Sequence, residues 1–256
     1  MKRIISLLLI TMMVLSLAAC KKNEKTFVLG LDDTFAPMGF RDDNNKIVGF
    51  DIDLAQAVCD KLGYKLKLQT IDWNAKEQEL NTKNIDCIWN GFSITDENKK
   101  KFLMTPAYMK NEISLVIKKD STITSNADMN GKSLAVQAGS SAEETLNKDE
   151  NKAFKDSLGK INPFGTYAIA MQDVDTGNSD AVLMDSIMAN YMIKEQGKDF
   201  KVLNDSLLED EYGIGFRKDD QKLCDAVWNA LKELKKDGKV AEISKKWFGS
   251  DITMIE

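Results

Sequence analysis

The chain has 256 residues, a formal net charge of −5 and a hydrophobic content of 43%. This acidic balance argues against a nucleic-acid partner, which would need a basic surface. The absence of histidine excludes histidine-based catalytic triads, histidine metal sites and imidazole general bases. The length suits one large domain or two of about 100 residues.

The N-terminus has the pattern of an export signal. Lys2 and Arg3 precede an apolar run that is too short to span a membrane and that ends in Leu-Ala-Ala-Cys, which resembles a bacterial lipobox. An ordinary signal peptide with a chance cysteine is the alternative. We predict a lipoprotein signal peptide at 1–19, lipid attachment at Cys20, a tether at 20–26 and a location on the extracytoplasmic face of the cell membrane.

Three cysteines remain besides Cys20, namely Cys59, Cys87 and Cys224. An odd number cannot all pair internally, and no C-x-x-C spacing indicates a metal site. We expect buried free thiols, with one disulfide plus one unpaired thiol as the alternative.

From residue 26 onward, strand and helix patterns alternate. A polar run at 42–45 lacks the ligand spacing of a calcium loop and predicts a hairpin turn. A polar segment at 118–130 separates two α/β series. Strands are predicted at 27–31, 64–70, 86–89, 113–117, 133–137 and 181–184, an extended stretch at 212–216, and helices at 49–63, 75–80, 167–175, 223–234 and 241–247.

The stretch 90–103 joins a buried strand to a helix. Gly91 allows close approach to the backbone, Ser93 and Thr95 carry hydroxyl groups, and Thr95 stands at the N-cap position. A strand end followed by a helix N-terminus is where open α/β sheets bind small anions. A plain β-turn-α connection is the alternative.

The second series repeats this arrangement. A Gly139-Ser140-Ser141 turn follows a strand and precedes a helix, so two such turns could face one another across a cleft. Asp185 ends a later strand and is either a ligand for an ammonium group or part of a helix cap. Trp73 could equally cover a bound cation or pack in the core.

A resemblance covers nearly the whole chain after the signal peptide. The sequence is similar to the bacterial extracellular solute-binding proteins of family 3, which bind polar amino acids for ABC importers. The stretches that carry the resemblance are LDDTFAPMGF at 31–40, VGFDIDLAQAV at 48–58, TKNIDCIWNGFSITDENKKKF at 82–102, TPAY at 105–108, MNGKSLAVQAGSSAE at 129–143, SDAVLMDS at 179–186, YGIGFRKD at 212–219 and KKWFG at 245–249.

The resemblance implies a two-lobed α/β fold of the type II periplasmic-binding-protein kind, with the ligand in the cleft between lobes and two hinge crossovers. Lobe 1 would comprise 27–110 and 212–256, and lobe 2 would comprise 111–211. Ligand binding would close the lobes by hinge motion, and the closed form would dock on a membrane permease.

Family roles transfer position by position. Asp185 matches the residue that pairs with the ligand's α-ammonium group, which favours that role over a cap. Phe35 and Trp73 match positions that sandwich the ligand. The residues predicted to bind the ligand are Asp32, Phe35, Trp73, Asn90, Gly91, Ser93, Asn98, Gln137, Ser140, Ser141 and Asp185, with no catalytic residue, metal ligand or cofactor.

One position departs from the family pattern. The resemblance implies an arginine three residues after Thr95, where it would clamp the ligand's α-carboxylate, but this chain has Asn98. With Asn98, a neutral amide hydrogen bond would take the place of a charge-assisted pair between arginine and the carboxylate. The loss of ligand-binding free energy would be on the order of 2 to 4 kcal/mol for a partly desolvated pair. A purely structural alternative is that Asn98 bonds back toward Thr95, as in a capping box.

Asn98 leads to three hypotheses for the function. In the first, the protein binds an amino acid with lower affinity. In the second, it binds an amine or another cation without a carboxylate, and in the third it is a signalling or scaffold lipoprotein. An enzyme is disfavoured, because no second acid–base group can be placed beside the site. Asp32 favours a donor-bearing or cationic side chain, so the candidates are glutamine, arginine, lysine, histidine or cystine, bound by a monomer that delivers to an ABC permease.

Overall fold

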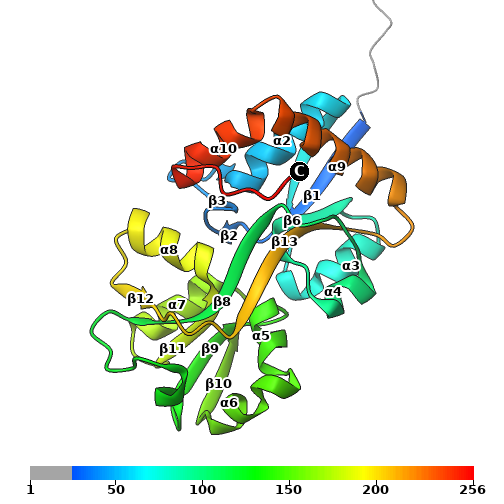
Figure 1. The fold of residues 1–256 in the computed structure, drawn as a ribbon. Helices are drawn as coiled ribbons and strands as arrows, with labels where there is room; N and C mark the ends of the chain where they lie inside the picture. The colour runs from blue at the N-terminus through cyan, green and yellow to red at the C-terminus, as the bar shows by residue number, and fades with distance from the viewer. Residues whose placement is uncertain (1–24) are drawn as a thin grey trace, which may run out of the picture.

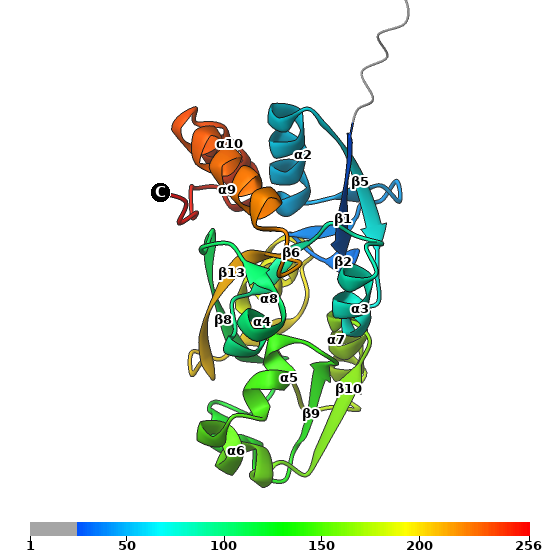
Figure 2. The same ribbon diagram turned by 90° about the vertical axis from the view of Figure 1, so that its right-hand side faces the viewer.

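Two α/β lobes lie end to end in the computed structural model, which describes residues 25–256 (Figures 1 and 2). The predicted signal peptide and Cys20 lie outside the described residues. Strand β1 begins at Lys25, so it includes the last two residues of the predicted tether. Within the described residues, no helix combines the length and apolar character needed to cross a bilayer.

A single continuous sheet runs through both lobes. Three parallel strands form its part in lobe 1, and three strands, with β9 parallel to both neighbours, form its part in lobe 2. Two long antiparallel strands join these parts. The order is β10 (Lys160–Phe164), β9 (Ser133–Gln137), β11 (Ala181–Asp185), β8 (Met109–Lys118), β13 (Leu208–Phe216), β6 (Cys87–Ser93), β1 (Lys25–Leu31) and β5 (Tyr64–Thr70).

Short strands complete the sheets. β7 (Leu103–Met104) pairs with β13, and β12 (Phe200–Val202) pairs with β8. A separate antiparallel sheet consists of β2 (Thr34–Phe35), β3 (Gly39–Arg41) and β4 (Ile47–Val48). β3 and β4 enclose the polar run at 42–45, which confirms the predicted hairpin turn.

Amphipathic helices cover the sheet of lobe 1. α2 (Phe50–Leu62) buries a face that includes Leu54 and Val58 and ends at Gly63, whose φ of 70° suits a residue without a Cβ atom. α9 (Gln221–Lys236) and α10 (Lys239–Phe248) pack with α2 at the top of Figure 1. Two short helices belong to the same lobe: α3 (Lys76–Asn81) contacts β6, and α4 (Asp96–Lys101) contacts β7.

Lobe 2 has its own set of helices. α7 (Tyr167–Asp175) matches the predicted range and packs on β9, β10 and β11, while α8 (Ser186–Glu195) packs on β8 and β12. α5 (Ser141–Leu146) begins at the predicted serine turn, and α6 (Lys152–Ser157) follows it. Single 3-10 turns lie at η1 (Trp73–Ala75), η2 (Asn126–Met129) and η3 (Asp149–Asn151).

Strands β8 and β13 are the two crossovers between the lobes. β13 pairs with β6 of lobe 1, and β8 pairs with β11 of lobe 2. Both strands extend beyond the ranges that the sequence predicts, and their antiparallel register places Asn111 opposite Asp210. This confirms the predicted two-lobed fold class. The predicted lobe limits fall inside these strands and stay a prediction.

The three described cysteines are buried free thiols, which confirms that prediction. Cys59 lies in α2, Cys87 begins β6 and Cys224 lies in α9. Burial raises the pKa of all three thiols, so each is an unreactive apolar side chain at neutral pH.

Arg217 fastens the end of β13 to lobe 1. Its guanidinium Nη1 donates to the carbonyl oxygens of Ile85 at 2.6 Å and Leu80 at 3.2 Å, and Nη2 lies 3.2 Å from Asp86 Oδ1. The Arg217 side chain is 11% exposed. Three acceptors on two other segments therefore depend on one cation.

We expect Arg217→Met to lower the free energy of unfolding by about 2–4 kcal/mol, because it leaves these acceptors without a donor. Lys152→Met is the control, since Lys152 forms only an exposed i,i+4 pair with Asp156 and its removal costs about 0.5 kcal/mol or less. Urea denaturation measures both. Equal midpoints for the two variants would contradict the anchoring role.

Candidate functional site

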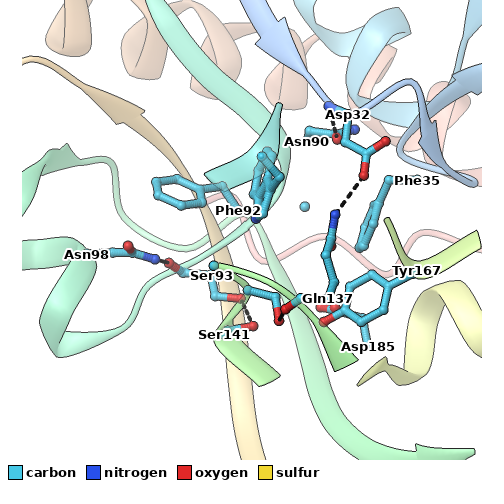
Figure 3. A pocket seen from close by; sticks show the side chains of 14 residues that line it. Asp32, Phe35, Asn90, Phe92, Ser93, Asn98, Gln137, Ser141, Tyr167 and Asp185 are labelled. Carbon is cyan, nitrogen blue, oxygen red and sulfur yellow. Dashed lines mark hydrogen bonds between the residues drawn. The ribbon is translucent and has the colours of Figure 1, made fainter. Parts of the chain in front are cut away.

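A cavity lies between the lobes. All eleven residues that the sequence predicts to bind a ligand line it, together with three residues outside that set (Figure 3). These three are Phe92, Gly139 and Tyr167. The residues come from the carboxyl ends of β1, β5, β6, β9, β10 and β11 and from the segments that follow, which is where open α/β sheets bind ligands.

Side chains of the two lobes meet directly at the cavity. Gln137 Nε2 of lobe 2 donates to Asp32 Oδ2 of lobe 1 at 2.8 Å. On another side, Ser93 Oγ and Ser141 Oγ form a hydrogen bond at 2.9 Å, and Thr95 Oγ1 donates to Glu144 Oε2 at the same distance. These contacts connect the two turns that the sequence predicts to face one another across the cleft.

Lys76 adds a fourth contact between lobes. Its Nζ donates to the carbonyl oxygen of Gly139 at 2.7 Å and to that of Trp73 at 3.2 Å, and it lies 5.3 Å from the centre of the Trp73 ring. Burial lowers the pKa of this ammonium group to about 8. A lysine at the start of a short helix carries no sequence pattern that marks it, so it was not predicted.

Asp185 lies at the floor of the cavity. It occupies the N-cap position of α8, but its side chain caps no backbone N–H. Instead, Oδ1 accepts hydrogen bonds from Asn111 Nδ2 at 2.7 Å and from the Tyr212 hydroxyl at 2.6 Å. Burial raises its pKa to about 7, and the nearby Asp210 carboxylate adds to the rise. The helix-cap alternative therefore does not describe this side chain, which faces the cavity in Figure 3.

Asp32 lies at the opposite end of the cavity. Its Oδ1 accepts from the backbone N–H and hydroxyl of Thr34, and its own N–H donates to Asn90 Oδ1 at 3.0 Å. Burial raises its pKa. Asn90 thus serves as a support for the Asp32 backbone, while the Asp32 carboxylate points toward Gln137 (Figure 3).

Aromatic rings form the walls between these two carboxylates. The ring centroids of Phe35 and Tyr167 are 5.9 Å apart. Those of Trp73 and Phe92 are 5.8 Å apart, with the rings edge to face. Trp73 is 8% exposed, so it packs in a core cluster and lines the cavity at once. Tyr167 was missed because it opens α7 as an ordinary apolar helix position, whereas the fold brings it against Phe35.

Asp51 supports the backbone of β6 at Gly91. Gly91 has a φ of 56°, and a Cβ atom there would lie 2.7 Å from Phe35 Cε1. Its N–H donates to Asp51 Oδ2 at 2.7 Å, which also accepts from the Tyr108 hydroxyl at 3.0 Å. Asp51 was not predicted, although a carboxylate on the buried face of a helix is a signal that could have revealed it.

The polar groups of Asn98 form hydrogen bonds with nearby residues of the same segment. Its backbone N–H donates to Thr95 Oγ1 at 3.0 Å, which confirms Thr95 as the N-cap, and its Nδ2 donates to the carbonyl oxygen of Ser93 at 2.9 Å (Figure 3). The structural alternative is therefore correct for the backbone, while the side chain bonds to Ser93 instead of Thr95. In the second lobe, Ser140 caps α5 by accepting from the N–H of Glu143.

The cavity favours positive charge. Asp32 and Asp185 are its charged lining residues, and no arginine lines it within residues 25–256. The same residues contain no group of three or more side chains able to hold a metal ion. A ligand with a cationic group at one end and a polar or cationic group at the other matches this lining.

The model for bacterial extracellular solute-binding proteins, family 3, matches residues 27–250. The chain belongs to this family. The L-cystine-binding protein TcyJ of Escherichia coli (strain K12) is 30% identical over 234 residues, covering 91% of this chain and 86% of TcyJ. The arginine-binding extracellular protein ArtP of Bacillus subtilis (strain 168) is 30% identical over 258 residues, covering 97% of this chain and 98% of ArtP.

Solved structures agree with this assignment. An ABC uptake transporter substrate-binding protein from Streptococcus pneumoniae, with bound histidine, superposes with a TM-score of 0.86 at 40% identity, covering 90% of this chain and 94% of that one. These similarities confirm the type II periplasmic-binding-protein fold of this family 3 solute-binding protein.

We expect Asp51→Asn to remove a pH-dependent loss of stability from this solute-binding protein. Burial raises the pKa of Asp51 from 3.8 to about 7. Between these two pH values the folded state therefore keeps a proton that the unfolded state has released. The stabilisation present at pH 4 is therefore lost as the pH rises toward 7, by a few kcal/mol. Melting temperatures at pH 5 and pH 8 test this: the difference, variant minus wild type, becomes more positive at pH 8. An unchanged difference would contradict a neutral buried Asp51.

Proposed function

We propose that this family 3 protein is the substrate-binding lipoprotein of an ABC importer, and that it captures a polar or cationic amino acid between its lobes and delivers it to the membrane permease. Family membership and the amino-acid-binding relatives support the capture step. The lipobox at 17–20 supports the lipid anchor. The protein would act as a monomer that performs no chemistry on its ligand.

The single observation that carries this proposal is the environment of Asp185. A buried carboxylate with two neutral donors, Asn111 and Tyr212, still lacks a counter-charge. An α-ammonium group placed in the cavity would supply that charge and a third set of donors. Aromatic rings on both sides would cover the ligand's carbon atoms and exclude water.

Hinge closure is supported by the way the lobes are joined. Only β8 and β13 carry the described chain from one half of the sheet to the other. The contacts of Gln137 with Asp32 and of Ser93 with Ser141 link the lobes directly at the cavity. A ligand that contacts both lobes would stabilise this arrangement over one with the lobes apart.

The far end of the cavity indicates the ligand's side-chain class. Asp32 and Gln137 can accept from and donate to a polar side chain, and the Asp32 carboxylate favours a cationic one. Glutamine, arginine, lysine, histidine and cystine stay the candidates. Arginine, cystine and histidine are named in the relatives.

A second candidate function is that of a receptor for an amine without a carboxylate. Asn98 favours it, because this residue stands where the family clamps the carboxylate and its amide bonds to the Ser93 carbonyl instead. Helix-end N–H groups of α4 and α5 would be the remaining partners for a carboxylate.

A thermal-shift screen of the mature chain tests the proposal. The ligands are the proteinogenic amino acids, cystine and the corresponding decarboxylated amines, because a ligand that binds the folded state raises the melting temperature. We expect one polar or cationic L-amino acid to raise it. Asp185→Asn should weaken that binding by about 30-fold or more, since it removes the counter-charge for the ammonium group.

Asp156→Asn is the control for the screen, because Asp156 is exposed and pairs only with Lys152. Its binding should equal that of the wild type. A shift with amines alone would favour the second candidate. No shift with any compound would refute both and favour a signalling or scaffold lipoprotein.

We expect Asn98→Arg to strengthen binding of the amino acid relative to its decarboxylated amine by about 10-fold or more, because it adds a charge-assisted partner for the carboxylate. Asn98→Gln, which keeps a neutral amide, should leave this ratio unchanged. Isothermal titration calorimetry measures both. If the arginine variant folds and the ratio stays at the wild-type value, the carboxylate does not lie near position 98.

A further inference from the structure

A second buried carboxylate lies near Asp185, outside the cavity lining. Asp210 is 6% exposed and accepts hydrogen bonds from Ser93 Oγ at 2.7 Å and from Asn111 Nδ2 at 3.0 Å. The same Asn111 nitrogen donates to Asp185 at 2.7 Å. Two carboxylates therefore converge on one neutral amide group.

The strand register explains this convergence. Asp210 of β13 stands directly opposite Asn111 of β8, and Asp185 of β11 stands opposite Ile113, two positions further along β8. Residues two apart on a strand share a face of the sheet. The three side chains are therefore held together by the sheet that joins the lobes, so the carboxylates cannot separate without disturbing the crossovers.

No cation in residues 25–256 balances this pair. Neither carboxylate forms an ion pair with a lysine or arginine, and their partners are neutral groups. Burial raises the pKa of both carboxyl groups, and each would be raised further by a negative neighbour. The other titratable or charged groups that face the pair are Tyr167, Tyr212 and Glu211, Asp32 across the cavity, and Asp96, Lys110, Glu112, Lys148 and Glu209 in the groove beside Asp210.

We propose that Asp185 and Asp210 share one proton when no cation is bound, and that the ligand's cationic group displaces this proton to the solvent on binding. Asp210 is then a positioning residue that sets the charge of the site without touching the ligand. This inference rests on the proposed function for the identity of the ligand, but the shared proton is a property of the protein alone. Affinity should rise with pH as the pair loses its proton.

Carbon-13 NMR of the ligand-free mature chain, labelled at the carboxyl carbon of aspartate, tests the shared proton. D185N and D210N assign the two signals. We expect a carboxyl group of the pair to titrate above pH 6 in the wild type, and the Asp185 signal to titrate at lower pH in D210N, because its negative neighbour is gone. Two signals that stay at their ionised positions down to pH 5.5 would overturn the proposal.

Calorimetry with L-arginine tests the displacement, since its ammonium and guanidinium groups keep their charge between pH 5.5 and 7.5. Titrations in phosphate and in Tris, which differ in ionisation heat, count the protons released. We expect release at pH 6.5 and an affinity about tenfold higher at pH 7.5 than at pH 5.5. In D210N both effects should largely disappear, while the amide oxygen of the new side chain can still accept from Ser93 and Asn111.

D180N is the matched control, because Asp180 is a hydrogen-bonded carboxylate of lobe 2 that contacts Ser133 away from the cavity. It should release protons as the wild type does. Arginine binding without proton release would overturn the displacement. A chain that binds no screened ligand but shows the NMR titration would keep the shared proton and refute the proposed function, so the two failures are distinct.

Discussion

The pairing of β8 with β13 is the constraint on which the rest of this structure depends. These strands are the crossovers between the lobes, and their register brings Asn111 and Asp210 together beneath the cavity. Each lobe adds one further group to that point, Ser93 from β6 and Asp185 from β11. The crossovers between the lobes and the floor of the site are therefore the same piece of sheet.

Charge gives the cavity its chemical preference. Asp32 and Asp185 lie at its two ends, aromatic rings lie between them, and Lys76 is held at the edge by two carbonyl oxygens. Buried carboxylates without a cation are costly, which means that a cationic ligand gains more here than a neutral one. Asn98, which stands where the resemblance implies an arginine, is neutral, so it adds no positive charge to attract a carboxylate.

Much of the fold and the lining of the site could be predicted from the sequence, because both depend on local patterns. The alternation of strands and helices fixes the ranges of β9 and α7, and the strand ends place Asp32, Gly91, Ser140 and Asp185 at one edge of the sheet. Lys76, Asp51, Asn111 and Asp210 were missed. Each is a polar residue whose role comes from a partner far along the chain, and Asp210 lies within a run of acidic residues that looks like a solvated strand edge.

By itself, the sequence determined the strand and helix pattern through hydrophobic periodicity, and its short motifs determined the family resemblance, which in turn implied the two-lobed class and the residues that line the cavity. The tertiary structure alone decided how the buried charges are partnered. Asn111 lies 74 residues from Asp185 and 99 from Asp210, and no local pattern encodes a contact over such separations. Strand register sets these neighbours, and burial then changes their protonation, because the free energy of a charge depends on everything packed around it.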